Sequence, residues 1–256
     1  MRRLVTIGTA VAVLIGAGAA YAATHFNSYS GSSLSITKGA GSPAKPVGLS
    51  MVENLKAAGM NGERAAPLTD IKVTIYGVKL DVGKLPTCSD AKIDAKKTNP
   101  DGSCSTSSLI AAGTVGSLLG SPDPTQAGTP CNPHLNVFNG GPRKQVFYFW
   151  TKSSADCGGL TTGQTLPYDA TISYSGKNAV INVPLPPDIS TAVAGHQGLY
   201  GSLIHEVLHY PKTVKGKAYM VGVGCKAGKR PWSIQFKAHQ YDGSTDTQTV
   251  KGSSAC

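Results

Sequence analysis

Apolar and polar residues alternate with a period of two along much of the chain. Ile71, Val73 and Ile75 are separated by polar or aromatic residues, a pattern that predicts a β-strand with one buried face. The stretches 134–151 and 170–183 each contain two β-rich runs around a glycine-containing turn. Each stretch therefore predicts a β-hairpin.

Three further short strands are expected near the C-terminus, at 218–225, 232–241 and 246–250. Turn residues recur at short spacing throughout. This favours an all-β fold, an antiparallel β-sandwich or barrel-like domain with at most short helices. The only helical fragment that we expect is Ser89–Ala95, with Ser89 or Asp90 as its N-cap.

The second strand of the first hairpin is apolar on both faces. Phe147 and Phe149 fall on one face, and Val146, Tyr148 and Trp150 fall on the other. A central strand buried on both sides has this composition. The alternative is an open aromatic face that stacks on sugar rings.

The six cysteines indicate a disulfide framework. An even number of cysteines is typical of proteins that mature in an oxidising compartment. Pairing between neighbours in the sequence would close three loops, each worth roughly 3 kcal/mol in the chain-entropy account. The expected pairs are Cys88–Cys104, Cys131–Cys157 and Cys225–Cys256. A cysteine zinc cluster would need close C-x-x-C pairs, and the sequence has none.

The N-terminal residues resemble a secretory signal peptide. Arg2 and Arg3 precede an apolar run, and Ala20-Tyr21-Ala22 provides a small-x-small cleavage site. We expect a signal peptide at 1–22, export by the general secretion route and no transmembrane anchor after cleavage. A flexible leader rich in Ser, Gly, Ala and Pro is expected at 23–45, followed by a single β-sandwich-like domain at 46–256.

The chain is basic, with a formal net charge of +10. An exported basic protein is attracted to anionic cell-wall polymers or to a membrane surface, whereas nucleic acid is not an expected partner. The region from 212 to 237 contains no acidic residue. The candidate binding residues are Lys212, Lys215, Lys217, Lys226, Lys229 and Arg230. Alternatively, these residues are solvated charges that keep strand edges from pairing.

Residues 205–209 read His-Glu-Val-Leu-His and match the zinc-peptidase signature H-E-x-x-H. In a helix, His205 and His209 would rise together by about 6 Å on one face and could share one zinc ion, with Glu206 as the base. In a strand, the two histidines would stand about 13 Å apart, and the glutamate would point to the opposite face.

The surroundings of this motif favour a strand. Gly195, Gly198 and Gly201 precede it, and Pro211 follows it, so a helix here would be short and weak. Alternation then places Leu203, His205, Val207 and His209 on one face of the strand. The other face carries Ile204, Glu206, Leu208 and Tyr210.

A zinc site would also need a third ligand. The positions that the metzincin and gluzincin patterns require are not occupied by histidine or glutamate. The remaining candidates are His196, His239, Asp242 and Asp246. We therefore expect neither a cofactor nor catalysis, and the alternative is a secreted zinc-dependent metallopeptidase.

Three segments together resemble a group of secreted actinobacterial proteins of unknown function. They are GERAAPLTDIKVTIYGV, LPTCSDAKIDA and the long stretch from Gly198 to Phe236. The resemblance implies an exported protein and no particular activity. The sequence thus predicts a disulfide-stapled β protein of the cell envelope or medium with a binding or structural role.

Overall fold

The computed structural model describes residues 25–80, 84–95, 103–159, 165–240 and 242–256. The predicted signal peptide at 1–22 lies outside these residues.

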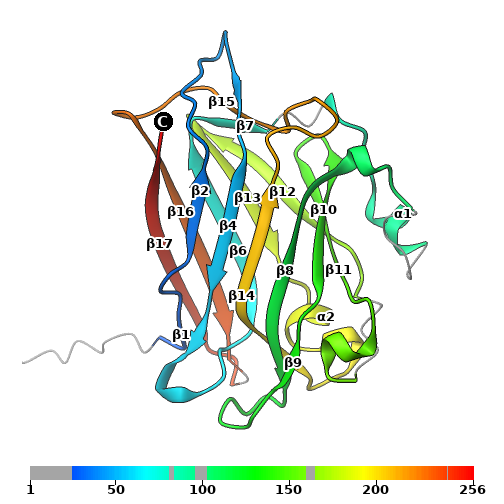
Figure 1. The fold of residues 1–256 in the computed structure, drawn as a ribbon. Coiled ribbons are helices and arrows are strands. Elements are labelled where there is room, and N and C mark those ends of the chain that lie inside the picture. The colour runs from blue at the N-terminus through cyan, green and yellow to red at the C-terminus, as the bar shows by residue number, and fades with distance from the viewer. Residues whose placement is uncertain (1–24, 81–83, 96–102, 160–164, 241) are drawn as a thin grey trace, which may run out of the picture.

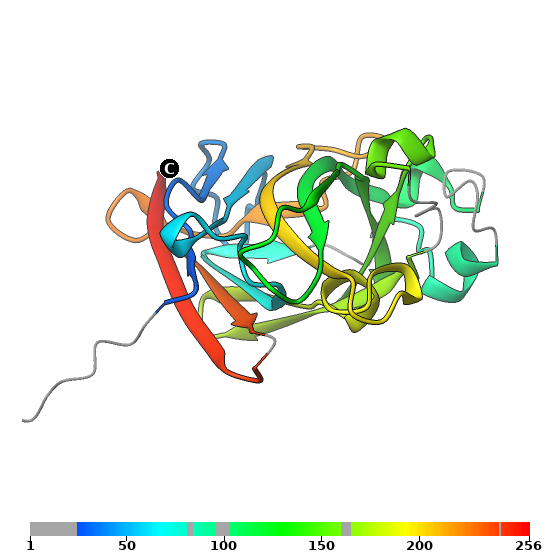
Figure 2. The same ribbon diagram turned by 90° about the horizontal axis from the view of Figure 1, so that it is seen from below.

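Most strands belong to one antiparallel sheet that curls around a common interior (Figures 1 and 2). Among the described residues, the sheet has 12 strands, and 11 of them follow each other in the order β17-β16-β6-β13-β12-β11-β10-β8-β14-β4-β2. The short strand β9 pairs with β8 outside this path. The strands are β2 Ser33–Ile36, β4 Met51–Lys56, β6 Leu68–Tyr76, β8 Leu109–Gly120, β9 Thr129–Cys131, β10 His134–Gly141, β11 Lys144–Trp150, β12 Tyr168–Ser175, β13 Asn178–Pro184, β14 Tyr200–Tyr210, β16 Lys229–His239 and β17 Thr245–Ala255. The predicted all-β, barrel-like fold is confirmed.

The two edge strands of this path, β2 and β17, lie side by side and nearly close the sheet (Figure 1). Because the other neighbours are antiparallel and the path has an odd number of strands, its first and last strands run in the same direction. Side chains rather than a backbone ladder join them. The Ser254 hydroxyl donates to the Leu34 carbonyl at 3.2 Å and accepts from the Ile36 amide at 3.3 Å.

Both predicted hairpins form. The first joins β10 to β11 through Pro142 and Arg143, and the second joins β12 to β13 through Gly176 and Lys177. Gly176 has φ 58°, in the left-handed region that favours glycine.

Two small sheets lie beside the large one. The strands β3 Val47–Gly48 and β7 Val78–Leu80 flank β15 Met220–Gly222, and β1 Asn27–Ser28 pairs with β5 Ala58–Gly59. The strand expected at 218–225 corresponds to β15 and is shorter than predicted. It belongs to this small sheet and not to the large sheet that contains β14 and β16. Its pairing with β7 and β3 places it across one end of the large sheet (Figure 1).

The prediction of a flexible leader at 23–45 is wrong for residues 25–45, which the structure describes. Tyr29, Leu34 and Ile36 are buried in the main core, and the Tyr29 ring stacks on Phe236 at 4.0 Å between ring centroids. Strand β2 pairs with β4. This segment therefore forms one edge of the nearly closed sheet.

The main core fills the interior of the sheet. The side chains of Ile71, Val73 and Ile75 point into it, as their alternation predicts. Phe147 and Phe149 also face this core.

The outer face of β10 and β11 is covered by a second core. Val146 and Tyr148 pack there with Ile93, which lies on the short helix α1 Asp90–Asp94. The Ser89 side chain caps α1 by accepting from the Lys92 amide. Because α1 and its loop cover the outer side of β11, this strand is buried on both faces, as the first interpretation of its sequence requires.

All three expected disulfides form. The Cα atoms are 5.7 Å apart in Cys88–Cys104, 3.7 Å in Cys131–Cys157 and 6.5 Å in Cys225–Cys256. The first holds the loop that carries α1 against the second core. The third links the end of β17 to the turn before β16.

One end of the sheet carries most of the remaining helical turns (Figure 1). These are η1 Met60–Gly62, η5 Ser154–Cys157, α2 Pro187–Ser190 and η6 Val193–Gly195, while η4 Thr106–Ser108 precedes β8. We refer to this end as the α2 end, and to the opposite one, where β7 and β15 lie, as the β15 end. In the described part of the chain, no helix is long and apolar enough to cross a membrane.

Candidate functional site

The H-E-x-x-H segment lies in the middle of strand β14. His205 and His209 are exposed on the outer face, and Glu206 is buried and points into the interior. The His205 ring lies against Gly116 of the neighbouring strand β8, where any side chain would collide with it. The strand thus separates the glutamate from the two histidines, and these three residues do not meet around one point.

A β-bulge changes the faces that simple alternation assigns to the start of β14. Leu203 pairs with Ser117 and His205 with Gly116, which leaves Ile204 as an extra residue. Ile204 is therefore 41% exposed, and Leu203 faces inward with Glu206. The prediction that Leu203 shares a face with His205, and Ile204 with Glu206, is wrong for this reason.

The residues considered as a third zinc ligand lie elsewhere. Asp246 accepts a hydrogen bond from His25 at 3.0 Å, while Asp242 caps its own turn by accepting from Ser244. No group of three or more His, Cys, Asp or Glu side chains lies close enough to hold a metal ion within the residues that the structure describes.

Glu206 instead has a second glutamate as its neighbour. Glu53 on β4 pairs with Leu208, and Glu206 pairs with Leu55, so the two glutamates are diagonal neighbours on the inner face of the sheet. Such diagonal neighbours lie roughly 7 Å apart. Glu53 is 6% exposed and Glu206 is 8% exposed.

Burial changes the chemistry of both carboxyl groups. Loss of hydration raises the pKa of Glu53 from its ordinary value of 4.5 to about 7. Loss of hydration and then the nearby Glu53 charge raise the pKa of Glu206 to about 8. At neutral pH the pair therefore holds at least one proton in the folded protein.

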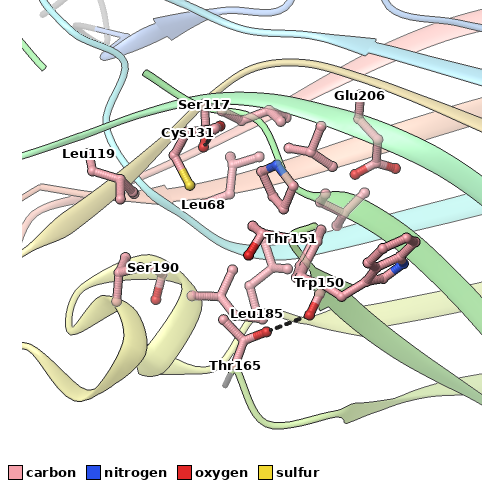
Figure 3. Close-up of a pocket in the computed structure, with 18 residues that line it drawn as sticks. Leu68, Ser117, Leu119, Cys131, Trp150, Thr151, Thr165, Leu185, Ser190 and Glu206 are labelled. Atoms are coloured by element: carbon pink, nitrogen blue, oxygen red, sulfur yellow. Dashed lines mark hydrogen bonds between the residues drawn. The ribbon is translucent and has the colours of Figure 1, made fainter. Parts of the chain in front are cut away.

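A pocket extends from Glu206 toward the α2 end (Figure 3). Its cavity volume is about 90 Å³, and its walls come from β6, β8, β11, β14 and α2. Glu206 lies at one end of this pocket, and Leu119 and Ser190 lie at the other (Figure 3). The Thr165 hydroxyl in the wall donates to the Phe149 carbonyl at 3.0 Å. A smaller cavity of about 20 Å³ is lined by both glutamates, and it shares Ile71, Leu185 and Glu206 with the lining of the larger pocket.

Glu53 is not among the site residues predicted from the sequence. The signal was present, because Met51 and Leu55 flank it at a spacing of two and alternate with Val52 and Asn54. A glutamate on the apolar face of a strand indicates a buried carboxyl group.

The predicted basic residues gather at the β15 end. The connection after β14 carries Lys212, Lys215 and Lys217. Lys226 lies in the tight turn that precedes β16, and Lys229 is the first residue of β16. All five side chains are exposed. Lys217 also donates to the Lys84 carbonyl at 2.8 Å, which ties its connection to the segment that follows β7.

The prediction that Arg230 forms part of a binding surface is wrong, because its side chain is buried. Its side chain is 0% exposed, and its Nη2 donates to the Gly39 carbonyl at 3.0 Å. Alternation along β16 places it on the inner side between the exposed Lys229 and the half-buried Pro231. Burial lowers the pKa of its guanidinium.

Other exposed basic residues extend the β15 end beyond the predicted set. They are Lys38, Lys45, Lys79, Lys84, Arg143 and Lys177. The connections 37–46, 211–219 and 223–228 at this end contain no acidic residue. We call these side chains and the five predicted lysines the basic end.

Carboxylates gather at the opposite, α2 end of the sheet. The described acidic residues in the turns and strand ends there are Glu63, Asp123, Asp156, Asp188, Asp242 and Asp246. Arg64 at this end is held by the carbonyls of Ser121 and Gln126 rather than free in solvent. The turns of the α2 end therefore carry carboxylates together with the exposed lysines Lys56 and Lys152. At the β15 end, Asp90 and Asp169 lie near Lys144, beside Arg143, while the connections 37–46, 211–219 and 223–228 are purely basic.

No protein-family model, curated protein or solved structure matches this chain.

Proposed function

We propose that this is an exported, non-enzymatic protein of the cell envelope or medium that binds an anionic cell-wall polymer through its basic end. The observation that carries the proposal is the concentration of exposed basic side chains at the β15 end, where the connections 37–46, 211–219 and 223–228 contain no acidic residue. A protein with this distribution orients its basic end toward a polyanion.

The arrangement of the lysines suits an extended partner. The two groups at 212–217 and 226–229 lie on separate connections at the same end of the sheet (Figure 1). A polymer with repeated phosphate or carboxylate groups can contact both connections at once. Single exposed contacts of this kind are weak, on the order of 1 kcal/mol or less, so binding depends on their number.

The three disulfides support export, because such bonds form and persist in oxidising compartments. The signal-peptide pattern at 1–22 and the resemblance to secreted actinobacterial proteins agree with this.

A non-enzymatic role is supported by strand β14. The metallopeptidase alternative needs His205, Glu206 and His209 around one ion, and the strand directs the glutamate to the opposite face.

Binding can be tested with inorganic polyphosphate and with isolated bacterial cell walls at low and high salt. We expect saturable binding to both, weakening steeply as salt rises because exposed charges are screened within about 10 Å at 0.1 M. Vesicles containing anionic lipid serve as the comparison. Binding to vesicles but not to either polymer would replace the polymer with a membrane surface, and binding unaffected by salt would contradict the proposal.

A further inference from the structure

The pocket is lined by an ionisable side chain with no hydrogen-bonding partner among the described residues. Glu206 is more than nine-tenths buried and lines the cavity, and no hydrogen bond to its carboxyl group comes from the part of the chain that the structure describes. The same holds for Glu53, which contacts the smaller cavity. Two buried carboxyl groups thus line neighbouring cavities that share Glu206 as a wall residue.

An arrangement of this kind is costly for stability alone. Moving a carboxyl group out of water without a hydrogen-bonding partner is unfavourable, and a second carboxyl group nearby adds repulsion when both are ionised. A leucine at either position would be buried without this loss of hydration. Leu55 and Leu208 occupy the neighbouring inward positions in this way. A ligand that supplies the missing positive partner would offset this cost.

We propose that the pocket binds a linear primary alkylamine, with its ammonium group against Glu206 and Glu53 and its alkyl chain directed toward the α2 end. The wall along this path is apolar, formed by side chains such as Val115, Phe149 and Leu203. The pocket covers the inner face of β14 from Glu206 to Gly201, which pair with Val115 and Leu119 of β8, a length of roughly 13 Å at the usual rise per strand residue.

The size of the cavity favours a chain over a ring. Its volume of about 90 Å³ is spread along the inner face of β14 from Glu206 to Gly201, and a linear alkyl chain matches such an elongated space better than a ring does. The pair of carboxyl groups favours an amine over other head groups. An alcohol would supply no charge, and a carboxylate would be repelled.

This site is separate from the basic end and does not depend on the proposed function. Its residues lie in the middle and α2 end of the sheet, whereas the lysines project from the β15 end.

The test is calorimetric titration of the full exported protein with n-hexylamine, 1-hexanol and hexanoate. We expect hexylamine to bind one molecule per chain, about tenfold or more tighter than hexanol, because a hydrogen bond to a charged group is stronger than a neutral one. Hexanoate should not bind. Equal or tighter binding of hexanol, or no binding of hexylamine at millimolar concentration, would overturn the proposal.

Two variants make the test specific. Glu206→Gln keeps the shape of the side chain and should weaken hexylamine binding about tenfold or more, while hexanol binding changes little. Glu63→Gln is the matched control, because Glu63 is exposed and lies outside the pocket. Loss of affinity in both variants, or in neither, would contradict the assigned site. The series of three ligands on the unmodified protein keeps the proposal falsifiable even if Glu206→Gln does not fold.

Discussion

Glu53 and Glu206 are diagonal neighbours on the inner face of β4 and β14, and both side chains are buried. The residues that pair with them across the two strands are the apolar Leu208 and Leu55, so each carboxyl group lies beside a leucine side chain. The pair makes the stability of the fold depend on pH.

The free energy of unfolding should fall as the pH rises from about 4.5 through about 8. The pKa of each glutamate is raised in the folded state, from 4.5 to about 7 for Glu53 and about 8 for Glu206. Between these values the unfolded chain binds fewer protons than the folded one, so stability is lost with increasing pH. Tyr168 and Tyr210 face the same space and stay protonated, because burial raises their pKa values further.

Denaturant unfolding of the parent and of Glu206→Gln at several pH values checks this. The variant should show a smaller slope and, at the upper end of the range, should be more stable on the order of 2 kcal/mol. The exposed Glu63→Gln variant should follow the parent. Identical slopes for the parent and Glu206→Gln would show that Glu206 does not keep its proton in the folded state.

Ile93→Ala should destabilise the protein by about 2–5 kcal/mol. Ile93 is 0% exposed and joins α1 to the second core on the outer face of β10 and β11. Truncating it leaves a cavity in that core. Lys92→Ala on the same helix is the control, because Lys92 is exposed, and it should change stability by about 0.5 kcal/mol or less. Equal effects of the two changes would mean that α1 is not packed as described.

Replacing Cys225 and Cys256 together by alanine should lower the free energy of unfolding by roughly 3 kcal/mol. This disulfide spans 31 residues and ties the end of β17 to the turn before β16. Thermal and denaturant unfolding under non-reducing conditions measure the change. A negligible loss would mean that the β16–β17 pairing alone holds the C-terminal edge.

The double variant His205→Ala, His209→Ala should have the same metal content as the parent, with no stoichiometric zinc in either. The two imidazoles lie on the outer face of a strand, and their spacing does not allow one ion to bind both. Elemental analysis of the untagged, exported protein measures this. One zinc per parent chain, lost in the double variant, would revive the peptidase alternative.

Local patterns in the sequence were sufficient to predict much of the sheet. The alternation at Ile71, Val73 and Ile75 predicted an inward face, and Gly176 marked a hairpin turn that forms at that place. Pairing between cysteines that are neighbours in sequence was also correct. These features depend on interactions within short stretches of chain.

The features that differ from the prediction depend on partners far away in the chain. Strand β2 is short and lies in a Ser- and Gly-rich segment, and its role becomes evident only beside β17, where Ser254 bonds to Leu34 and Ile36. The bulge at Ile204 is likewise set by its pairing with β8 and cannot be read from alternation alone.

In the site, too, local features could be predicted from the sequence and features that depend on distant residues could not. Alternation placed Glu206 on one face with Leu208 and Tyr210, but its partner Glu53 lies on a different strand, more than a hundred residues away in the chain. Arg230 was included in the basic surface because charge along the sequence does not reveal which side chain the fold buries.

The most direct test of the proposed function compares two variants with the same change in charge. One replaces the five exposed lysines of the predicted basic set by glutamine, at Lys212, Lys215, Lys217, Lys226 and Lys229. The other replaces five exposed lysines outside the basic end, at Lys56, Lys72, Lys152, Lys237 and Lys251.

Affinity for polyphosphate and for isolated cell walls is measured for both variants at low salt. We expect the first variant to lose about tenfold or more in affinity and the second to lose much less, because local contacts rather than net charge hold the polymer. Equal losses in the two variants, or no loss in the first, would contradict binding through the basic end.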